Sequence, residues 1–338
     1  MKNAFLGLFT LMVLFASHNK PITPVPPYKI TKRIHLEGDG FWDYLTVDQL
    51  TQQLYVSHGT QVQVIDLKTD KVIGVIPNTK GVHGVAISTE FSKGYISCGG
   101  DTSIAVFDLK SLTITGKIKA TGANPDAILY DAFSKRVFVF NHSGKNATVI
   151  DAAKNKVVGT IPLNGTVEFA VTDGKGKVFV NIEDKSSIAV IDAKSLKTVN
   201  EWSVSPGEEP TGLAFDAKNY RLFSVCSNRK MVVLDSKTGK VVQTLPIGAG
   251  CDGVAFDVKM RRIYCSNGEG TMTVIEQKSP NEYHVVETVT TQQGARTITL
   301  DSKSHRLFLS TAEREAPVGN ARPSLKPGTF VVLEISPL

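Results

Sequence analysis

The residues of this 338-residue sequence that are best able to do chemistry stand at one position of an internal repeat. A short apolar run that ends in Asp, or once in Ser, recurs seven times along the chain. Five residues before the end of these runs stand, in order, Asp43, His83, Asp126, Glu168, Thr211, Asp252 and Arg296. Four carboxylates, one imidazole and one guanidinium could bind a cation or exchange protons if the fold gathers them.

If the repeats close into a ring, Arg296 lies between Asp252 and Asp43, and we expect it to neutralise that arc. The opposite arc carries only carboxylates and imidazoles, which are ligands for divalent metals. We predict a metal site there, with the ligands His83, Asp126 and Glu168. The full predicted binding set adds the adjoining loops and comprises Asp43, His83, Asp126, His142, Glu168, Glu183, Asp252 and Arg296. A structural role, in which such residues satisfy loop N–H groups, stays open.

A second repeated string shows which elements must position this set. VIDLKTDKVIGVIP (64–77) recurs, for example, as VIDAAKNKVVGTIP (149–162) and VLDSKTGKVVQTLP (233–246). Its acidic markers are 41 to 43 residues apart except for a last interval of 58, and they are Asp66, Asp108, Asp151, Asp192, Asp235, Glu276 and Glu334. A period near forty is typical of propeller blades. The longer seventh unit carries an insertion at about 312–328, either a lid over the carboxylates or a tolerated surface loop.

Each repeat supplies four apolar runs rich in Val, Ile and Phe, separated by turns of Gly, Asp, Lys or Thr. No stretch shows a period of 3.6 residues, so the sequence predicts an all-β fold. Four antiparallel strands in each of seven units predict a single seven-bladed β-propeller. The last unit ends at its third strand, and we expect residues 28–36 to supply the fourth strand and close the ring.

The N-terminal segment has the layout of an export signal. Residues 1–17 hold one Lys and then a mostly apolar stretch, too short to cross a bilayer comfortably. We therefore expect a signal peptide at 1–17, a Pro-rich linker at 18–27, the propeller at 28–338 and a periplasmic or secreted protein without a membrane span in its mature chain. An uncleaved membrane anchor is the alternative.

The cysteines and the charge exclude several classes of protein. Four cysteines without a CxxC pair exclude a zinc ribbon, a thioredoxin motif and c-type haem attachment. In an oxidising compartment Cys226 and Cys251 could pair, and four buried thiols are the alternative. A net charge of +6 is too small to indicate a dedicated nucleic-acid protein.

The charges divide between the two rims of the predicted ring. The turns between strands one and two and between strands three and four carry more than half of the 38 basic residues. The channel mouth with the carboxylates lies on the other rim. Aromatic side chains for stacking a nucleic acid are scarce in the basic turns, where Phe91 and Tyr220 are the candidates.

The repeated strings, with the turns GANP (122–125) and GEEP (207–210), resemble those of the YVTN-type, YncE-like propeller family of exported bacterial proteins. The tetrapeptide that names the family is degenerate here and reads YVSH (55–58) and YISC (95–98). The resemblance spans roughly residues 28–338. It implies an exported propeller and says little about activity, although single-stranded DNA binding is reported for one relative.

Three functions follow from these features. The favoured one is an exported, non-enzymatic binding or scaffold protein whose contact surface is the acidic channel-mouth rim, with an unidentified protein or small molecule as partner. One alternative is a metal-assisted enzyme like the lactonase and lyase propellers. The other is single-stranded DNA binding through the basic rim. We expect a monomer, with a divalent metal as the one candidate cofactor. The sequence contains no GxSxG elbow, which disfavours Ser-His-Asp catalysis.

Overall fold

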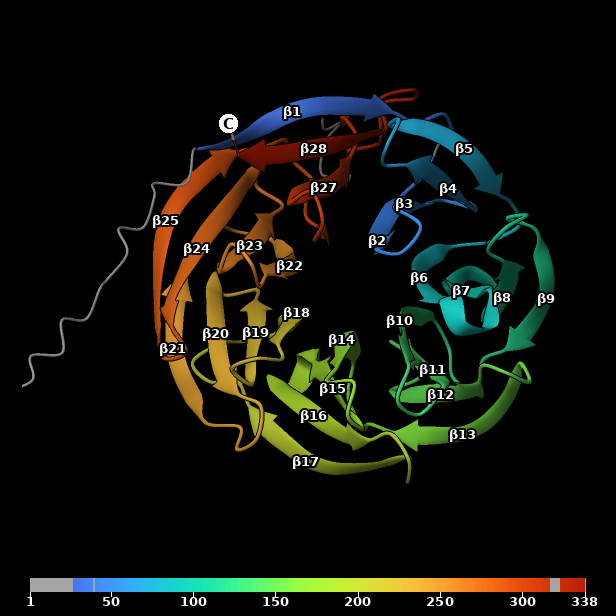
Figure 1. Ribbon diagram of the computed structural model, residues 1–338, viewed down its shortest axis with the longest axis horizontal. Coiled ribbons are helices and arrows are strands. Elements are labelled where there is room, and N and C mark those ends of the chain that lie inside the picture. Colours follow the sequence, from blue (N-terminus) through green and yellow to red (C-terminus); the bar gives the residue numbers. More distant parts are fainter. Residues whose placement is uncertain (1–26, 39, 317–322, 338) are drawn as a thin grey trace, which may run out of the picture.

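The computed structural model describes residues 27–38, 40–316 and 323–337. In this part of the chain the strands form seven four-stranded antiparallel sheets, which stand as blades around a central axis (Figure 1). The only helical elements among these residues are three short 3-10 turns, η1 (Thr89–Phe91), η2 (Gly99–Asp101) and η3 (Glu183–Lys185). The prediction of an all-β, seven-bladed propeller is confirmed.

The strands of the first four blades follow one another along the chain from the axis outwards. Blade 1 consists of β2 (Trp42–Asp48), β3 (Gln53–His58), β4 (Gln61–Asp66) and β5 (Lys71–Ile76), and blade 2 of β6 (Val82–Ser88), β7 (Lys93–Cys98), β8 (Ser103–Asp108) and β9 (Ile114–Lys119). Blade 3 consists of β10 (Pro125–Asp131), β11 (Arg136–Asn141), β12 (Asn146–Asp151) and β13 (Lys156–Pro162), and blade 4 of β14 (Val167–Thr172), β15 (Lys177–Ile182), β16 (Ser187–Asp192) and β17 (Lys197–Ser203).

Blades 5 and 6 repeat this order, and blade 7 departs from it. Blade 5 consists of β18 (Pro210–Asp216), β19 (Arg221–Cys226), β20 (Lys230–Asp235) and β21 (Val241–Pro246), and blade 6 of β22 (Cys251–Asp257), β23 (Arg262–Asn267), β24 (Thr271–Ser279) and β25 (Glu282–Thr290). Blade 7 contains β26 (Thr299–Asp301), β27 (Arg306–Thr311), β28 (Val331–Pro337) and β1 (Tyr28–His35).

The two ends of the described chain share blade 7. Strand β1 pairs antiparallel with β28, from Tyr28 opposite Pro337 to His35 opposite Val331 (Figure 1). The Tyr28 side chain is buried, and its hydroxyl lies 2.7 Å from the hydroxyl of Tyr264 in blade 6. The outermost strand of this blade therefore comes from the opposite end of the chain.

The repeated Asp residues form the turns. At the end of each innermost strand except those of blades 2 and 4, a buried Asp accepts hydrogen bonds from backbone N–H groups of the following turn, as Asp257 does from Lys259 and Met260. The Asp of the third strand does the same, as Asp66 does from Lys68. These are Asx turns, which favour Asp because its short carboxylate reaches the backbone two residues on.

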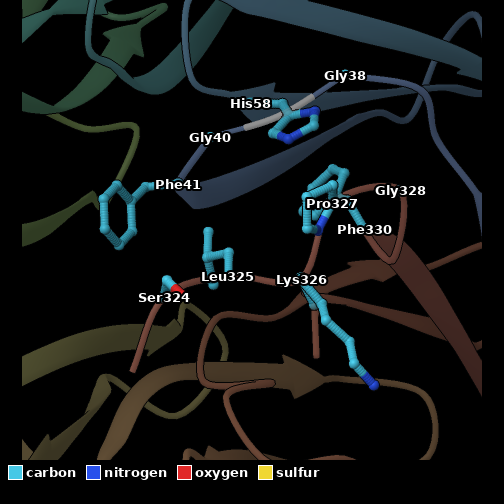
Figure 2. A pocket seen from close by; sticks show the side chains of 11 residues that line it. Gly38, Gly40, Phe41, His58, Ser324, Leu325, Lys326, Pro327, Gly328 and Phe330 are labelled. Atoms are coloured by element: carbon cyan, nitrogen blue, oxygen red, sulfur yellow. The ribbon is translucent and has the colours of Figure 1, made fainter. Parts of the chain in front are cut away.

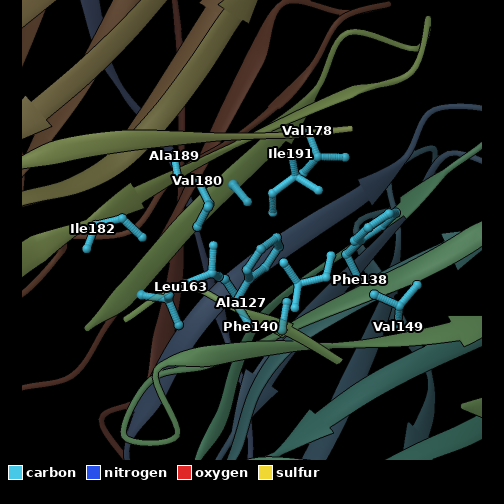
Figure 3. Close-up of a cluster of buried hydrophobic side chains, with 14 of the residues drawn as sticks. Ala127, Phe138, Phe140, Val149, Leu163, Val178, Val180, Ile182, Ala189 and Ile191 are labelled. Carbon is cyan, nitrogen blue, oxygen red and sulfur yellow. The ribbon is translucent and has the colours of Figure 1, made fainter. Parts of the chain in front are cut away.

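The core lies between the blades. The second and third strands of a blade are almost fully buried because a neighbouring blade covers each face, and their apolar runs are therefore continuous. Figure 3 shows this packing between blades 3 and 4, where Phe138 and Phe140 of β11 meet Val178 and Val180 of β15. The outermost strands leave Val and Ile side chains exposed, as at Ile73 of β5.

The predicted signal peptide at 1–17 lies outside the described residues, as does the predicted linker except for Pro27. No helix in the described ranges is long and apolar enough to span a membrane.

All four cysteines are buried free thiols. The considered pairing of Cys226 with Cys251 is wrong for this structure, because the two side chains pack in separate core clusters.

Candidate functional site

The channel mouth is built from the second residue of the innermost strands. Asp43, His83, Asp126, Glu168, Thr211 and Asp252 take this position in β2, β6, β10, β14, β18 and β22. Arg296 does not, because β26 begins three residues later at Thr299 and leaves Arg296 in the preceding loop. The spacing in the sequence thus predicts six of the seven strand positions.

A β-bulge marks the start of the innermost strand in blades 1 to 6, and a side chain of a neighbouring blade holds some of these starts. In β2 the pairing register with β3 shifts between Trp42 and Leu45, and the same shift recurs in the equivalent strands of blades 2 to 6. Such a bulge frees backbone groups from the ladder. The carbonyl of Asp43 accepts a hydrogen bond from the Thr297 hydroxyl of blade 7 at 2.9 Å. Contacts between blades therefore fix the backbone from which the mouth side chains project.

The first arc centres on Arg296. Arg296 Nε donates to Asp252 Oδ2 at 2.6 Å, and Arg296 Nη2 lies 3.9 Å from Asp43 Oδ1. Burial raises the pKa of Asp252, and Arg296 opposes this rise. This guanidinium therefore pairs with both carboxylates that flank it in the ring.

The second arc centres on His83. Its Nδ1 donates to Asp43 Oδ2 at 2.6 Å and lies 3.5 Å from Asp126 Oδ1. Burial alone would lower the pKa of His83, but the hydrogen bond to Asp43 and the charge of Asp126 raise it to about 9. Burial, followed by the charge of Asp43, also raises the pKa of Asp126. His83 and Asp126 therefore hold their protons more tightly than the same side chains do in water.

The third arc centres on His142, in the turn after β11. Its Nε2 lies 3.1 Å from Glu168 Oε1 and 3.8 Å from Glu183 Oε2, which belongs to η3. The hydrogen bond that His142 donates to Glu168 raises the pKa of His142 against the effect of burial. Burial raises the pKa of Glu168, which His142 opposes. His142 and Glu183, the two loop residues of the predicted binding set, thus lie together with Glu168 of the innermost strand β14.

These contacts group the predicted metal ligands differently from the sequence prediction. The structure brings His83 and Asp126 together with Asp43, while Glu168 pairs with His142 and Glu183. In each of these two trios, one ligand atom per residue lies within 4.8 Å of the others. One imidazole and two carboxylates in each trio could hold a divalent metal.

The sequence analysis did not identify a pair of aromatic side chains that lies beneath the mouth. Tyr44 and Phe169, each one residue after a mouth carboxylate, lie edge to face with 5.1 Å between ring centroids. Burial raises the pKa of Tyr44 well above its usual value, and the carboxylates around it, Asp126 first, add to the rise. Gly84, Ala127, Gly212, Gly253 and Thr297 take the equivalent position in the other blades. Only two of these seven equivalent positions hold an aromatic residue, and this contrast in the sequence could have revealed the pair.

The insertion of blade 7 builds a separate pocket on the same rim. Between β27 and β28 its described residues face the loop that precedes β2, and they enclose a volume of about 430 Å³ (Figure 2). Leu325 and Phe330 line this pocket together with Phe41 and His58. Lys326 pairs with Glu313 at 2.9 Å, within the insertion itself.

Aromatic side chains on the opposite rim are covered by lysines of the chain itself. Lys237 Nζ lies 3.5 Å from the ring centroid of Tyr220, and Lys194 Nζ lies 4.8 Å from that of Phe133, a residue the sequence analysis did not consider. A nucleobase would have to displace these cations before it could stack on either ring.

Two curated relatives match most of the chain, and no protein-family model matches it. "Uncharacterized protein YncE" of Salmonella typhimurium is 23% identical over 304 residues, covering 85% of this chain and 72% of that protein. The protein of the same name in Salmonella typhi is 22% identical over the same length. These matches and the seven blades support the predicted likeness to the YncE-like propellers.

Solved structures share the fold at low sequence identity. The WD40 repeats of RRP9 superpose with a TM-score of 0.78 at 9% identity, over 93% of this chain and 99% of that one. Hydrazine synthase from Kuenenia stuttgartiensis gives a TM-score of 0.71 at 17% identity, over 81% of this chain and 94% of that one. Identities this low show the propeller fold alone.

Proposed function

We propose that this YncE-like β-propeller is an exported binding or scaffold protein that takes a positively charged ligand at its acidic channel mouth. The fold and its YncE relatives support a binding or scaffold role in general. The export part depends on the apolar leader at 1–17. The ligand part depends on the electrostatics of the mouth.

The observation that carries the proposal is the state of the Asp126 carboxyl group. Asp126 is only 7% exposed, and its Oδ1 has no hydrogen-bond partner among the described residues. Its nearest cationic group is His83 Nδ1 at 3.5 Å, beyond good hydrogen-bond length. Asp126 therefore has one long ion pair with His83 and no hydrogen bond at Oδ1, and a buried carboxylate compensated this incompletely is costly unless it is protonated or joined by a further cation.

The composition of the mouth points to the same class of ligand. Five carboxylates surround one Arg and two His, and both imidazoles already contact carboxylates. The carboxylates of the mouth are Asp43, Asp126, Glu168, Glu183 and Asp252. Because Tyr44 and Phe169 meet beneath them, the ligand approaches from the rim that carries η3 and the blade 7 insertion. A cation placed there gains the attraction of several partly buried carboxylates at once.

Thermal unfolding with a panel of cations tests the proposal. The probes are Zn²⁺, Ca²⁺ and spermidine, with sodium chloride at matched ionic strength as the reference. We expect at least one probe to raise the melting temperature at concentrations above its Kd. Asp126→Asn removes the buried charge at nearly constant shape, and we expect it to abolish most of the rise.

Asp66→Asn is the matched control. It removes one carboxylate from a turn on the opposite rim, and Asn can still accept the hydrogen bond of Lys68 N–H. This control should keep the full response to the active probe. Equal responses of the two variants, or no response of the unaltered protein to any probe, would contradict the proposal.

A further inference from the structure

We propose that Asp43, His83 and Asp126 form a site for one divalent transition-metal ion of the zinc class. This inference rests on the proposed function, because it names the cation that the mouth takes. The three residues occupy the same strand position in three consecutive blades, in β2, β6 and β10. The repeat therefore determines the positions of all three residues.

The geometry is close to that of a coordination sphere. One oxygen from each carboxylate and one imidazole nitrogen lie within 4.8 Å of one another. Ligand atoms bound to zinc at about 2.0 to 2.2 Å in a tetrahedron lie roughly 3.3 to 3.6 Å apart. The separation of His83 Nδ1 from Asp126 Oδ1 is already 3.5 Å, while its separation from Asp43 Oδ2 is 2.6 Å. A metal entering the trio replaces the proton between His83 and Asp43 and needs that pair to open by roughly 0.7 to 1 Å.

The donor set selects the class of metal. One imidazole nitrogen with two carboxylate oxygens suits Zn²⁺ and its first-row neighbours. Ca²⁺ takes six to eight oxygen ligands and Mg²⁺ keeps several waters, so neither is well served by three donors of which one is nitrogen. The fourth position would face the rim, where a water or a ligand group reaches it.

Two further observations indicate a built site rather than an acidic cluster. The first is Asp126, which is 7% exposed and whose Oδ1 accepts no hydrogen bond from the described residues, its ion pair with His83 being 3.5 Å long. The second is the close approach of backbone to the His83 ring. A Cβ atom at Gly99 would lie 2.7 Å from His83 Nε2, so the glycine leaves room for an imidazole whose Nδ1 faces the carboxylates. Hydrogen bonds from Ser97 to the Asp126 carbonyl and from Thr297 to the Asp43 carbonyl hold the backbone of two ligands.

The trio around His142 is less prepared for a metal. Its His142 comes from a turn and its Glu183 from η3, and the side chain of Glu183 is 31% exposed against 10% for Asp126. The separation of His142 Nε2 from Glu183 Oε2 is 3.8 Å. We therefore assign the metal to the His83 trio and use the His142 trio as the control.

The experiment measures zinc bound to the full chain after treatment with EDTA and exchange into metal-free buffer. We expect one Zn²⁺ per chain by elemental analysis and a saturable calorimetric titration. Asp126→Asn should weaken zinc binding at least tenfold, while Glu183→Gln should change it less than twofold. Both substitutions remove one carboxylate from the same rim. Unchanged affinity in Asp126→Asn, or an equal loss in both variants, overturns the assignment.

A second measurement needs no variant. Diethyl pyrocarbonate modifies unprotonated imidazoles, so the reaction is run near pH 9, where a useful fraction of the His83 rings is unprotonated, and mass spectrometry reports each histidine separately. We expect Zn²⁺ to slow modification of His83 at least fivefold and to leave His142 within twofold. Equal protection of both overturns the assignment. If spermidine stabilises the protein through Asp126 while zinc neither binds nor protects His83, the metal assignment fails and the proposed cation-binding function stands. If no cation acts through Asp126, both fail.

Discussion

Tyr44 of blade 1 and Phe169 of blade 4 meet edge to face at the axis of the ring, although 125 residues separate them in the sequence. Each follows a mouth carboxylate by one residue, so the aromatic contact lies directly below the acidic ring. Edge-to-face contacts add about 0.5 to 1.5 kcal/mol beyond the area that they bury. The pair connects blades 1 and 4, which are not neighbours in the ring.

We predict that Phe169→Ala lowers the free energy of unfolding by about 2 to 3 kcal/mol, because it removes a partly buried ring and opens a gap beneath the mouth. Urea denaturation followed by tryptophan fluorescence measures this. Phe133→Ala is the control, since Phe133 is 42% exposed, and it should lower the free energy by less than about 1 kcal/mol. Equal losses in the two variants would show that the contact of Phe169 with Tyr44 adds no more to the free energy of unfolding than an exposed ring does.

We predict that stability falls as the pH rises from 6.5 to 9. The pKa of His83 is raised to about 9 in the folded protein, and that of Asp126 is also raised. The folded chain therefore holds protons that the unfolded chain releases, and raising the pH favours unfolding. The loss should be roughly 1 to 3 kcal/mol across this range.

Urea denaturation at several pH values measures this loss, and the NMR titration of the His83 ring checks its origin. His83→Gln should flatten the pH dependence because it removes the imidazole. A free energy of unfolding that is constant or rises between pH 6.5 and 9 in the unaltered protein would refute the assignment of this proton.

We predict that Tyr28→Ala destabilises the protein by about 3 to 5 kcal/mol. Tyr28 is 5% exposed, and its hydroxyl pairs with Tyr264 across the contact between blades 7 and 6. Lys29→Ala alters the neighbouring exposed side chain of β1 and should change stability by less than about 0.5 kcal/mol. Differential scanning calorimetry distinguishes these outcomes, and a Tyr28→Ala melting temperature equal to that of the control would argue against the importance of β1.

We predict four free thiols that react only after unfolding. Burial raises the pKa of Cys98 to about 11 and that of Cys226 to about 12, so neither is a thiolate at pH 8. Iodoacetamide under native, non-reducing conditions should label almost no cysteine, and labelling in denaturant should modify all four. Two unlabelled cysteines in denaturant without reductant would reveal a disulfide bond instead.

The sequence predicted the fold well because the repeat encodes it locally. The Asp of each turn, as at Asp66, and the apolar runs around it fix strand, turn and strand within one unit. Counting back from Asp131 or Asp257 then finds the mouth because the innermost strands have nearly constant length. This counting placed Asp43, His83 and Asp126 in equivalent positions.

The sequence did not predict which side chains pair at the mouth. Asp43 accepts from His83 and also lies near Arg296, so it belongs to two arcs at once. Glu168 is equivalent to Asp126 in strand position, but its longer side chain reaches His142. Such choices depend on side-chain length and on loop geometry, which the repeat does not constrain.

The pairing of β1 with β28 fixes the time at which the molecule can finish folding. The ribosome makes β1 before the other described strands and β28 after them, so the seventh sheet cannot assemble before β28 has been made. Until then blades 1 and 6 present apolar faces, including Leu54 and Met272, that blade 7 later covers. Without the pairing of β1 with β28 the chain is an open arc with an apolar face at each end, and such exposed faces are prone to aggregate.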